Sequence, residues 1–241
     1  VKRVNIQNES ILLKQAVTNS IYHITPFTLL DFPHKTACII WYAGCNMRCH
    51  YCYNPDIVKG KGTISHEDAF KWISSRKGFL DGVVLSGGEC LMDKKIESFI
   101  QNLKEHGFLI KLDTNGSYPV RLKSLVQNQL INYIALDFKA LPNQFYKVTQ
   151  SGLFNKFQQS LEFLIKINAP FEVRTTIHSK LLSPDDLLQM VHYLESRNYS
   201  GTYYLQNFFN NCKTLGELPN DYQFIKQGDF SSTKFEIIVR S

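Results

Sequence analysis

The stretch "WYAGCNMRCHYCYNP", residues 41–55, places three cysteines within eight residues of a 241-residue chain. The apolar run "TACIIWYA" at residues 36–43 overlaps its start and is typical of a short buried strand. Cys45, Cys49 and Cys52 therefore lie on a loop that directly follows a predicted strand. A loop with three thiols and no fourth beside them is the starting point for predicting both fold and chemistry.

The overall composition is that of an ordinary globular protein, with 44% hydrophobic and 20% charged residues. No apolar run approaches the length of a membrane span and no secretory signal pattern is present, so we expect a cytoplasmic protein without membrane association. The net charge of +6 is spread along the chain, which does not favour nucleic-acid binding. Cys38, Cys90 and Cys212 are isolated, and in a reducing compartment the clustered three are more typical of metal binding.

Strand-like and helix-like patterns alternate along the chain, with connections too long for hairpins. Such alternation requires a parallel sheet with right-handed crossovers. The predicted strands lie at residues 36–43, in the segments 81–89 and 108–116, which end in turn or polar residues, and at 131–139, 171–178 and 202–208. This predicts an α/β fold, a partial (β/α)6 TIM-like barrel whose cysteine loop follows the first barrel strand.

We expect a single domain over residues 1–241. Its predicted parts are an N-terminal extension at 1–18, a barrel core at 19–208 and a C-terminal tail at 209–241.

Polar residues gather where the predicted strands end. They are Ser86, Gly87, Gly88, Glu89, Asp113, Asn115, Asp137, Lys139, Arg174 and Gln206. Taken singly, these segments are turns or surface ion pairs. Because the carboxyl ends of parallel strands meet at one rim, where barrel enzymes carry their active sites, we expect them to converge with the cysteines.

Two metal sites fit three clustered thiols. A structural zinc ion needs four ligands, so His50 and the distant Cys90 or Cys212 would have to complete it. An electron-transfer [4Fe–4S] cluster takes four thiolates, and three would leave one iron open to an outside molecule.

The spacing C-x-x-x-C-x-x-C with aromatic Tyr51 before the last cysteine resembles the cluster motif of radical S-adenosylmethionine enzymes. The resemblance implies that Cys45, Cys49 and Cys52 hold a [4Fe–4S] cluster whose fourth iron binds S-adenosylmethionine. One-electron cleavage of this cofactor would give a 5′-deoxyadenosyl radical that abstracts hydrogen from a substrate.

The resemblance also implies roles for the rim residues. "SGGEC" at 86–90 is similar to a motif in which backbone groups and the Glu89 carboxylate bind the methionine ammonium. Lys139 would meet the cofactor carboxylate, while Asp113 and Asp137 would organise a polar floor. Asn115 and Arg174 are further cofactor-binding candidates.

Residues 20–210 resemble the anaerobic ribonucleoside-triphosphate reductase activating proteins, which are glycyl-radical enzyme activases. This implies a glycyl-radical enzyme as partner, with flavodoxin or ferredoxin as electron donor. In related activases a glycine follows the proline of the segment before the cluster, whereas His34 follows Pro33 here.

Two alternatives remain open from the sequence. One is a radical enzyme acting on a small molecule, similar to a 7-carboxy-7-deazaguanine synthase. The other is a zinc- or cluster-bearing binding module without catalysis.

Overall fold

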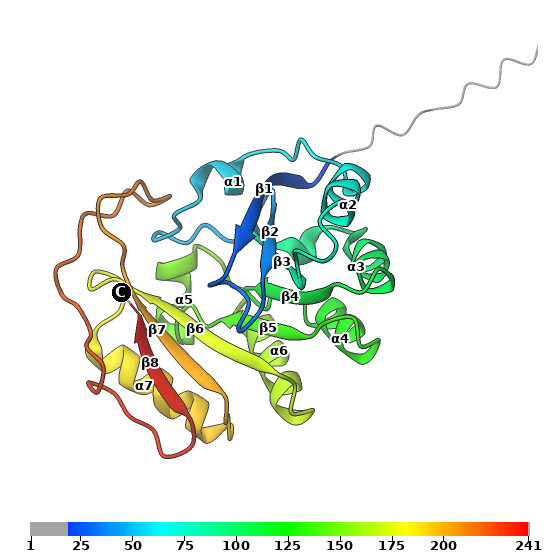
Figure 1. The fold of residues 1–241 in the computed structure, drawn as a ribbon. Coiled ribbons are helices and arrows are strands. Elements are labelled where there is room, and N and C mark those ends of the chain that lie inside the picture. The colour runs from blue at the N-terminus through cyan, green and yellow to red at the C-terminus, as the bar shows by residue number, and fades with distance from the viewer. Residues whose placement is uncertain (1–18, 241) are drawn as a thin grey trace, which may run out of the picture.

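The computed structural model describes residues 19–240, and the predicted extension at 1–18 lies outside the described residues. The described residues form one eight-stranded sheet in the order β1 to β8, with helices packed along its outer side (Figure 1). The strands are β1 (Ile21–Thr28), β2 (Ala37–Tyr42), β3 (Gly82–Gly87), β4 (Leu109–Thr114), β5 (Tyr133–Asp137), β6 (Phe171–Ile177), β7 (Thr202–Asn207) and β8 (Glu236–Arg240). The helices are α1 (Pro55–Lys59), α2 (His66–Ser74), α3 (Ile96–Glu105), α4 (Pro119–Gln127), α5 (Pro142–Thr149), α6 (Phe154–Lys166) and α7 (Pro184–Ser196), with a 3-10 turn, η1, at Cys90–Met92.

The parallel sheet predicted from the sequence is confirmed. The six predicted strands correspond to β2 through β7, and each pairs in parallel with the next. Two edge strands were missed. β1 pairs antiparallel with β2, and β8 continues the parallel run beside β7. The segment predicted as a C-terminal tail therefore contributes a strand to the sheet, at Glu236–Arg240.

The helix starts follow from local chemistry. Ser183 caps α7 by accepting a hydrogen bond from the Asp186 N–H, and the Asp186 carboxylate accepts from the Ser183 N–H in return. Ser65 caps α2 by accepting from the Asp68 N–H. These bonds satisfy N–H groups that a helix leaves without partners in its first turn.

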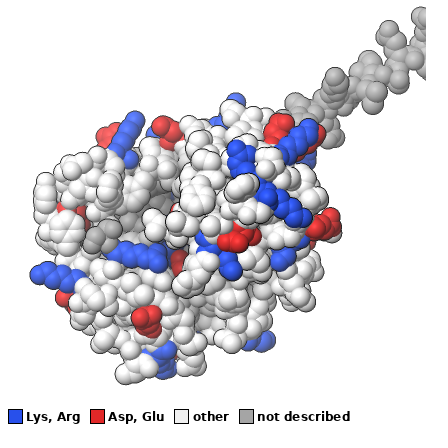
Figure 2. Space-filling view, viewed as in Figure 1, with Lys and Arg blue, Asp and Glu red and all other residues white. Residues whose placement is uncertain are grey.

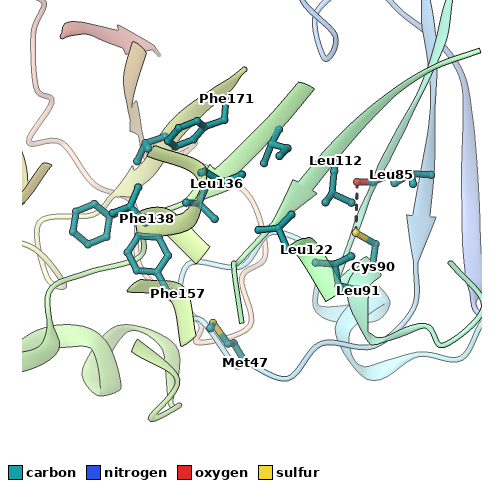
Figure 3. Close-up of a cluster of buried hydrophobic side chains, with 14 of the residues drawn as sticks. Met47, Leu85, Cys90, Leu91, Leu112, Leu122, Leu136, Phe138, Phe157 and Phe171 are labelled. Carbon is teal, nitrogen blue, oxygen red and sulfur yellow. Dashed lines mark hydrogen bonds between the residues drawn. The ribbon is translucent and has the colours of Figure 1, made fainter. Parts of the chain in front are cut away.

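The core lies between the sheet and the helices. Figure 3 shows part of it, with Leu85, Leu112 and Leu136 of neighbouring strands packed among helix and loop side chains. The Cys90 thiol donates within this core to the Leu85 carbonyl at 3.8 Å. Met47 of the cysteine loop is buried in the same cluster, so the loop is anchored by packing as well as by hydrogen bonds.

The opposite side of the sheet carries a small apolar cluster, which includes Phe32, Ile39 and Val84, and a polar part that curves around a cleft. Trp41 of β2 and Arg240 of β8 line the same cleft although their strands lie near opposite ends of the sheet order. β1 and β8 are the two ends of that order and do not pair with each other. The sheet is thus strongly curved and open between these strands. No helix among residues 19–240 has the length and apolar character needed to cross a membrane.

The segment after β7 is tied to the carboxyl end of β6. Asp221 accepts hydrogen bonds from the Ser179 N–H at 2.6 Å and from the Ser179 hydroxyl at 2.8 Å. His178, which is buried, contacts the Pro219 carbonyl through Nε2 at 2.9 Å. These bonds hold residues 209–223 against the rim of the cleft, although the segment has no regular secondary structure.

Candidate active site

A cleft of about 530 Å³ opens at the carboxyl ends of the strands, a size suited to a cofactor-sized ligand. The residues predicted from the sequence converge there as expected from a parallel sheet. Those lining the cleft are Cys45, Cys49, Tyr51, Cys52, Ser86, Gly87, Gly88, Asp113, Asn115, Asp137, Lys139, Arg174 and Gln206. Glu89 is the one predicted site residue that does not line it.

Main-chain hydrogen bonds hold the cysteine loop from two sides. On one side, the Arg48 and His50 N–H groups donate to carbonyls at the end of α5. On the other, the Leu215 N–H donates to the Cys52 carbonyl and the Gly216 N–H donates to the His50 carbonyl, each at 2.9 Å. The loop therefore has a fixed path before any ligand binds.

The thiol environment fits an iron–sulfur cluster. The Cys45 sulfur accepts from the Met47 N–H at 3.4 Å, and the Asn115 side-chain amide lies 3.9 Å from it. Donors of this kind stabilise thiolates bound to iron. Burial raises the pKa of Cys45 to about 12 and that of Cys49 to about 11, so metal binding has to displace their protons.

A site for a single metal ion, such as zinc, is not supported in the same way. In residues 19–240, no group of three histidine, cysteine or acidic side chains is placed to hold one metal ion. The thiolate ligands of a cluster bind different irons and need not meet at one point. The zinc alternative thus finds no ligand group in the described part of the chain.

Charged side chains of β4, β5 and β6, together with Lys139 just after β5, form one network on the cleft floor. Arg174 links the two carboxylates, with Nη2 3.0 Å from Asp137 Oδ1 and Nη1 3.4 Å from Asp113 Oδ2. Lys111 lies 2.5 Å from Asp113 Oδ1, and Lys139 lies 3.0 Å from Asp137 Oδ2. The network holds three cations and two anions, so its formal charge is positive.

These contacts fix the ionisation of the floor. Burial alone would raise the pKa of Asp113, but Arg174 and Lys111 lower it below its ordinary value. Burial likewise favours neutral Asp137, and Lys139 and Arg174 outweigh this and lower its pKa. Burial would lower the pKa of Lys139, yet Asp137 raises it well above the ordinary value. The carboxylates and Lys139 are therefore charged near neutral pH.

Glu89 lies behind the cleft instead of in it. The residue is only 1% exposed, and its two carboxylate oxygens accept from the Leu91 N–H, the Thr114 hydroxyl and the Asn115 N–H at 2.8–3.1 Å. These three contacts fix the turn that carries Asn115. The direct contact of Glu89 with a ligand ammonium stays a prediction.

The two glycines before Glu89 allow close backbone contact with the cysteine loop. Gly87 has φ of +120°, and a Cβ on Gly88 would overlap the carbonyl of Gly44. The Glu89 N–H donates to that same carbonyl at 2.9 Å. Glycine is required at both positions for different reasons. A Cβ on Gly88 would push the cysteine loop away from β3, whereas a Cβ on Gly87 would overlap the backbone of Tyr42 on β2.

Several cleft residues were not found from the sequence. They include Asp31, Trp41, Thr176, Phe209 and Arg240. Trp41 and Thr176 lie on predicted strands and could have been found by taking alternate residues along them. Arg240 and Phe209 lie in the segment predicted to be a tail. Asp31 lies in a loop, and no motif marks it as a site residue.

Comparison with known proteins accounts for this arrangement. A family model described as the radical SAM superfamily matches residues 39–194, from β2 to α7. The chain belongs to the radical S-adenosylmethionine superfamily. Members of this superfamily use a [4Fe–4S] cluster and S-adenosylmethionine, so these are the cofactors of this protein.

The curated relatives are activating enzymes. A Methanocaldococcus jannaschii protein provisionally named a glycyl-radical enzyme activating enzyme is 33% identical over 68% of this chain and 70% of its own length. The pyruvate formate-lyase-activating enzyme of Clostridium pasteurianum is 29% identical over 61% of this chain and 64% of its own length. The radical S-adenosylmethionine match and these relatives make the chain an enzyme of radical, oxidoreductase type.

Two solved structures with bound S-adenosylmethionine share the fold. Streptococcus suis SuiB bound to S-adenosylmethionine aligns with a TM-score of 0.60 at 11% identity, over 76% of this chain and 44% of SuiB. Native anSMEcpe with bound AdoMet aligns with a TM-score of 0.58 at 18% identity, over 69% of this chain and 49% of anSMEcpe. The chain thus matches less than half of each solved protein, and this likeness concerns the fold alone.

Proposed function

We propose that this protein generates a glycyl radical on a partner enzyme, and that the partner is the anaerobic ribonucleoside-triphosphate reductase. The observation that carries the proposal is the convergence of three thiols and a charged floor in one cleft, in a chain similar to glycyl-radical enzyme activating enzymes over most of its length. The resemblance of residues 20–210 to the reductase activating proteins supports the choice of partner.

Cys45, Cys49 and Cys52 would hold the [4Fe–4S] cluster, and the rim of β3 to β5 would hold S-adenosylmethionine. When bound, these cofactors supply one electron and a 5′-deoxyadenosyl radical that takes a hydrogen atom from the target glycine. The cleft accommodates such a group, and its thiols carry donor contacts of the kind that cluster sulfurs need.

Lys139 is the residue best suited to bind the cofactor carboxylate. Its ammonium lines the cleft and stays protonated because of Asp137. Arg174 and Lys111 keep Asp113 ionised, and Asp137 fixes the position of the Lys139 ammonium at 3.0 Å. The residues thus orient a zwitterionic ligand, since fixed charges favour one direction of its dipole.

The opening between β1 and β8 suits a protein substrate. It leaves one side of the cleft accessible to a loop of a folded partner. The face seen in Figure 2 has lysines and arginines interspersed with acidic residues, without the large basic surface typical of nucleic-acid binding. A flavodoxin or ferredoxin is the proposed electron donor, because such acidic proteins are attracted by a chain of net charge +6.

Parallel activation assays test the proposal. The cluster-loaded protein is incubated anaerobically with S-adenosylmethionine, reductant and either the anaerobic reductase or pyruvate formate-lyase. We expect a doublet electron paramagnetic resonance signal on the reductase, and deuterium from its labelled glycine in 5′-deoxyadenosine. A signal on pyruvate formate-lyase alone would mean that this enzyme, and not the reductase, is the partner. Label taken only from a free nucleoside or pterin would overturn the activase function.

A further inference from the structure

Three polar residues form a row across the last three strands. Thr176 on β6 is in register with Gln206 on β7, which is in register with Arg240 on β8. All three line the cleft. Two residues earlier on β6, Arg174 belongs to the charged floor network, so the row lies one step nearer the cleft mouth. The row extends the polar surface from the floor to the edge of the sheet.

Arg240 is held in a defined orientation at the outer end of this row. Its guanidinium carbon lies 3.5 Å from the centroid of the Tyr204 ring on the adjacent strand. Stacking of this kind restricts the plane of the guanidinium and leaves its in-plane N–H groups able to donate. The side chain is exposed, and no ion pair among residues 19–240 includes it.

The position of Arg240 separates it from the predicted cofactor residues. Those residues lie on the cysteine loop and on β3 to β6, whereas β8 is the last strand and borders the opening. Phe209, which is 69% exposed, lines the same cleft. A molecule entering between β8 and β1 therefore meets a fixed cation and an exposed aromatic ring.

The outer edge of β8 is closed to strand addition. The Gln227 side chain donates to the Ile237 carbonyl at 2.9 Å and accepts from the Val239 N–H at 2.8 Å. The amide thus takes the place of a neighbouring strand along this stretch. Recognition at this edge has to use side chains, and Arg240 is the charged residue of β8 that lines the cleft.

We propose that Arg240 is a specificity-determining residue that binds an acceptor oxygen of the polypeptide segment presented for hydrogen abstraction. The proposal rests on the proposed function in taking that segment to be part of a protein. The acceptor is a carboxylate or a main-chain carbonyl, both of which match the in-plane N–H donors of a stacked guanidinium.

Peptide binding measured without turnover tests this role. Fluorescein-labelled peptides that carry the glycine loop sequence of the reductase are titrated with the cluster-loaded protein and S-adenosylmethionine in the absence of reductant. One set carries glutamate beside the glycine and a matched set carries glutamine. We expect Arg240→Gln to weaken peptide binding about tenfold, as for loss of a charged hydrogen bond, and Arg240→Lys to restore part of it.

Arg76→Gln is the matched control. Arg76 also stacks on an aromatic ring, with its guanidinium carbon 3.6 Å from the Trp72 centroid, but it does not line the cleft. This variant should bind the peptides like the unmodified protein. If Arg240→Gln loses more affinity for the glutamate peptides than for the glutamine peptides, Arg240 binds the carboxylate. If the loss of affinity is equal for both sets, Arg240 binds a main-chain carbonyl.

Three results would separate this inference from the proposed function. Unchanged peptide binding by Arg240→Gln overturns the inference, even if a glycyl radical forms normally on the partner. Loss of S-adenosylmethionine affinity in place of peptide affinity overturns it as well, because Arg240 would then serve the cofactor. Peptide binding that depends on Arg240 without any radical on the partner supports the inference and contradicts the proposed function.

Discussion

In β4 the side chains alternate between two environments. Ile110 and Leu112 are fully buried against the helices, whereas Lys111 and Asp113 lie on the cleft side and join the charged network. The outer side of the sheet is stabilised by packing that needs no ligand. The inner side contains charges whose mutual contacts offset the cost of removing them from water. A shift of one residue along the strand therefore changes the physical role of a side chain.

The largest expected difference is in iron loading, between a cysteine of the cleft and a cysteine of the core. We expect Cys49→Ala to abolish cluster assembly, because one iron would lose its thiolate ligand. Cys90→Ala should keep full iron loading, since this thiol lies in the core and bonds to the Leu85 carbonyl. Iron counting and absorbance after anaerobic reconstitution measure both. Full iron content in Cys49→Ala would contradict the assigned ligands.

Truncation on the outer side should act on stability. Leu112→Ala is expected to lower the free energy of unfolding by about 2–5 kcal/mol, through lost burial and a residual cavity. Leu112→Met, which conserves volume, should cost less than about 1.5 kcal/mol. Urea unfolding gives both values. A loss in the alanine variant well below the range of about 2–5 kcal/mol would mean that this side of the sheet is loosely packed.

Truncation on the inner side should act on the ligand. Lys139→Ala is expected to weaken S-adenosylmethionine binding by the cluster-loaded protein about ten- to a hundredfold, which corresponds to one charged hydrogen bond of about 1.5–3 kcal/mol. Lys71→Ala serves as control, because Lys71 pairs with Glu67 on the exposed side of α2. Equal affinities in the two variants would show that the cofactor carboxylate lies elsewhere.

The smallest change is expected at Glu89, which lies between the cleft and the core. Glu89→Gln should cost about 1–3 kcal/mol of stability, because an NH₂ group replaces one carboxylate oxygen that accepts from protein donors. Burial raises the pKa of Glu89 from 4.5 to about 7. The folded state therefore holds this proton more tightly, and its contribution to stability falls as pH rises from about 4.5 to 7.

The variant tests that pH dependence directly. Between about pH 5 and 7.5 the unmodified protein should lose more stability than Glu89→Gln, which has no proton to release at this position. Urea midpoints at both pH values give the difference. Parallel pH profiles for the two proteins would show that Glu89 is already ionised in the acidic range.

The sequence was sufficient where pattern and chemistry coincide. The strands from β2 to β7 are apolar segments that end in turn residues, and the thiol spacing is specific enough to select the superfamily. The convergence of Asp113, Asp137 and Arg174 followed from strand direction alone. Their pairing could not be predicted, because it depends on the curvature of the sheet and on Lys111, which has the pattern of an ordinary strand residue.

Other features depend on contacts distant in sequence. The β8 segment is short, and its place in the sheet depends on where the irregular chain after β7 returns. Glu89 was expected to face the ligand because of its position beside the glycines. The bond of its carboxylate to the turn at Asn115 could not be predicted from that position. His34 has φ of +59°, a conformation that favours glycine, which agrees with the glycine expected there from related activases.

The docking of the segment after β7 onto the cysteine loop has a consequence for the order of folding. The Phe209 N–H donates to the Tyr53 hydroxyl across 156 positions of the chain, and the bonds of Leu215 and Gly216 to the same loop are similarly distant. Contacts so far apart in sequence form late, because loop closure has to precede them. A chain interrupted after β7 would present its three thiols on a loop with one side exposed to oxidants.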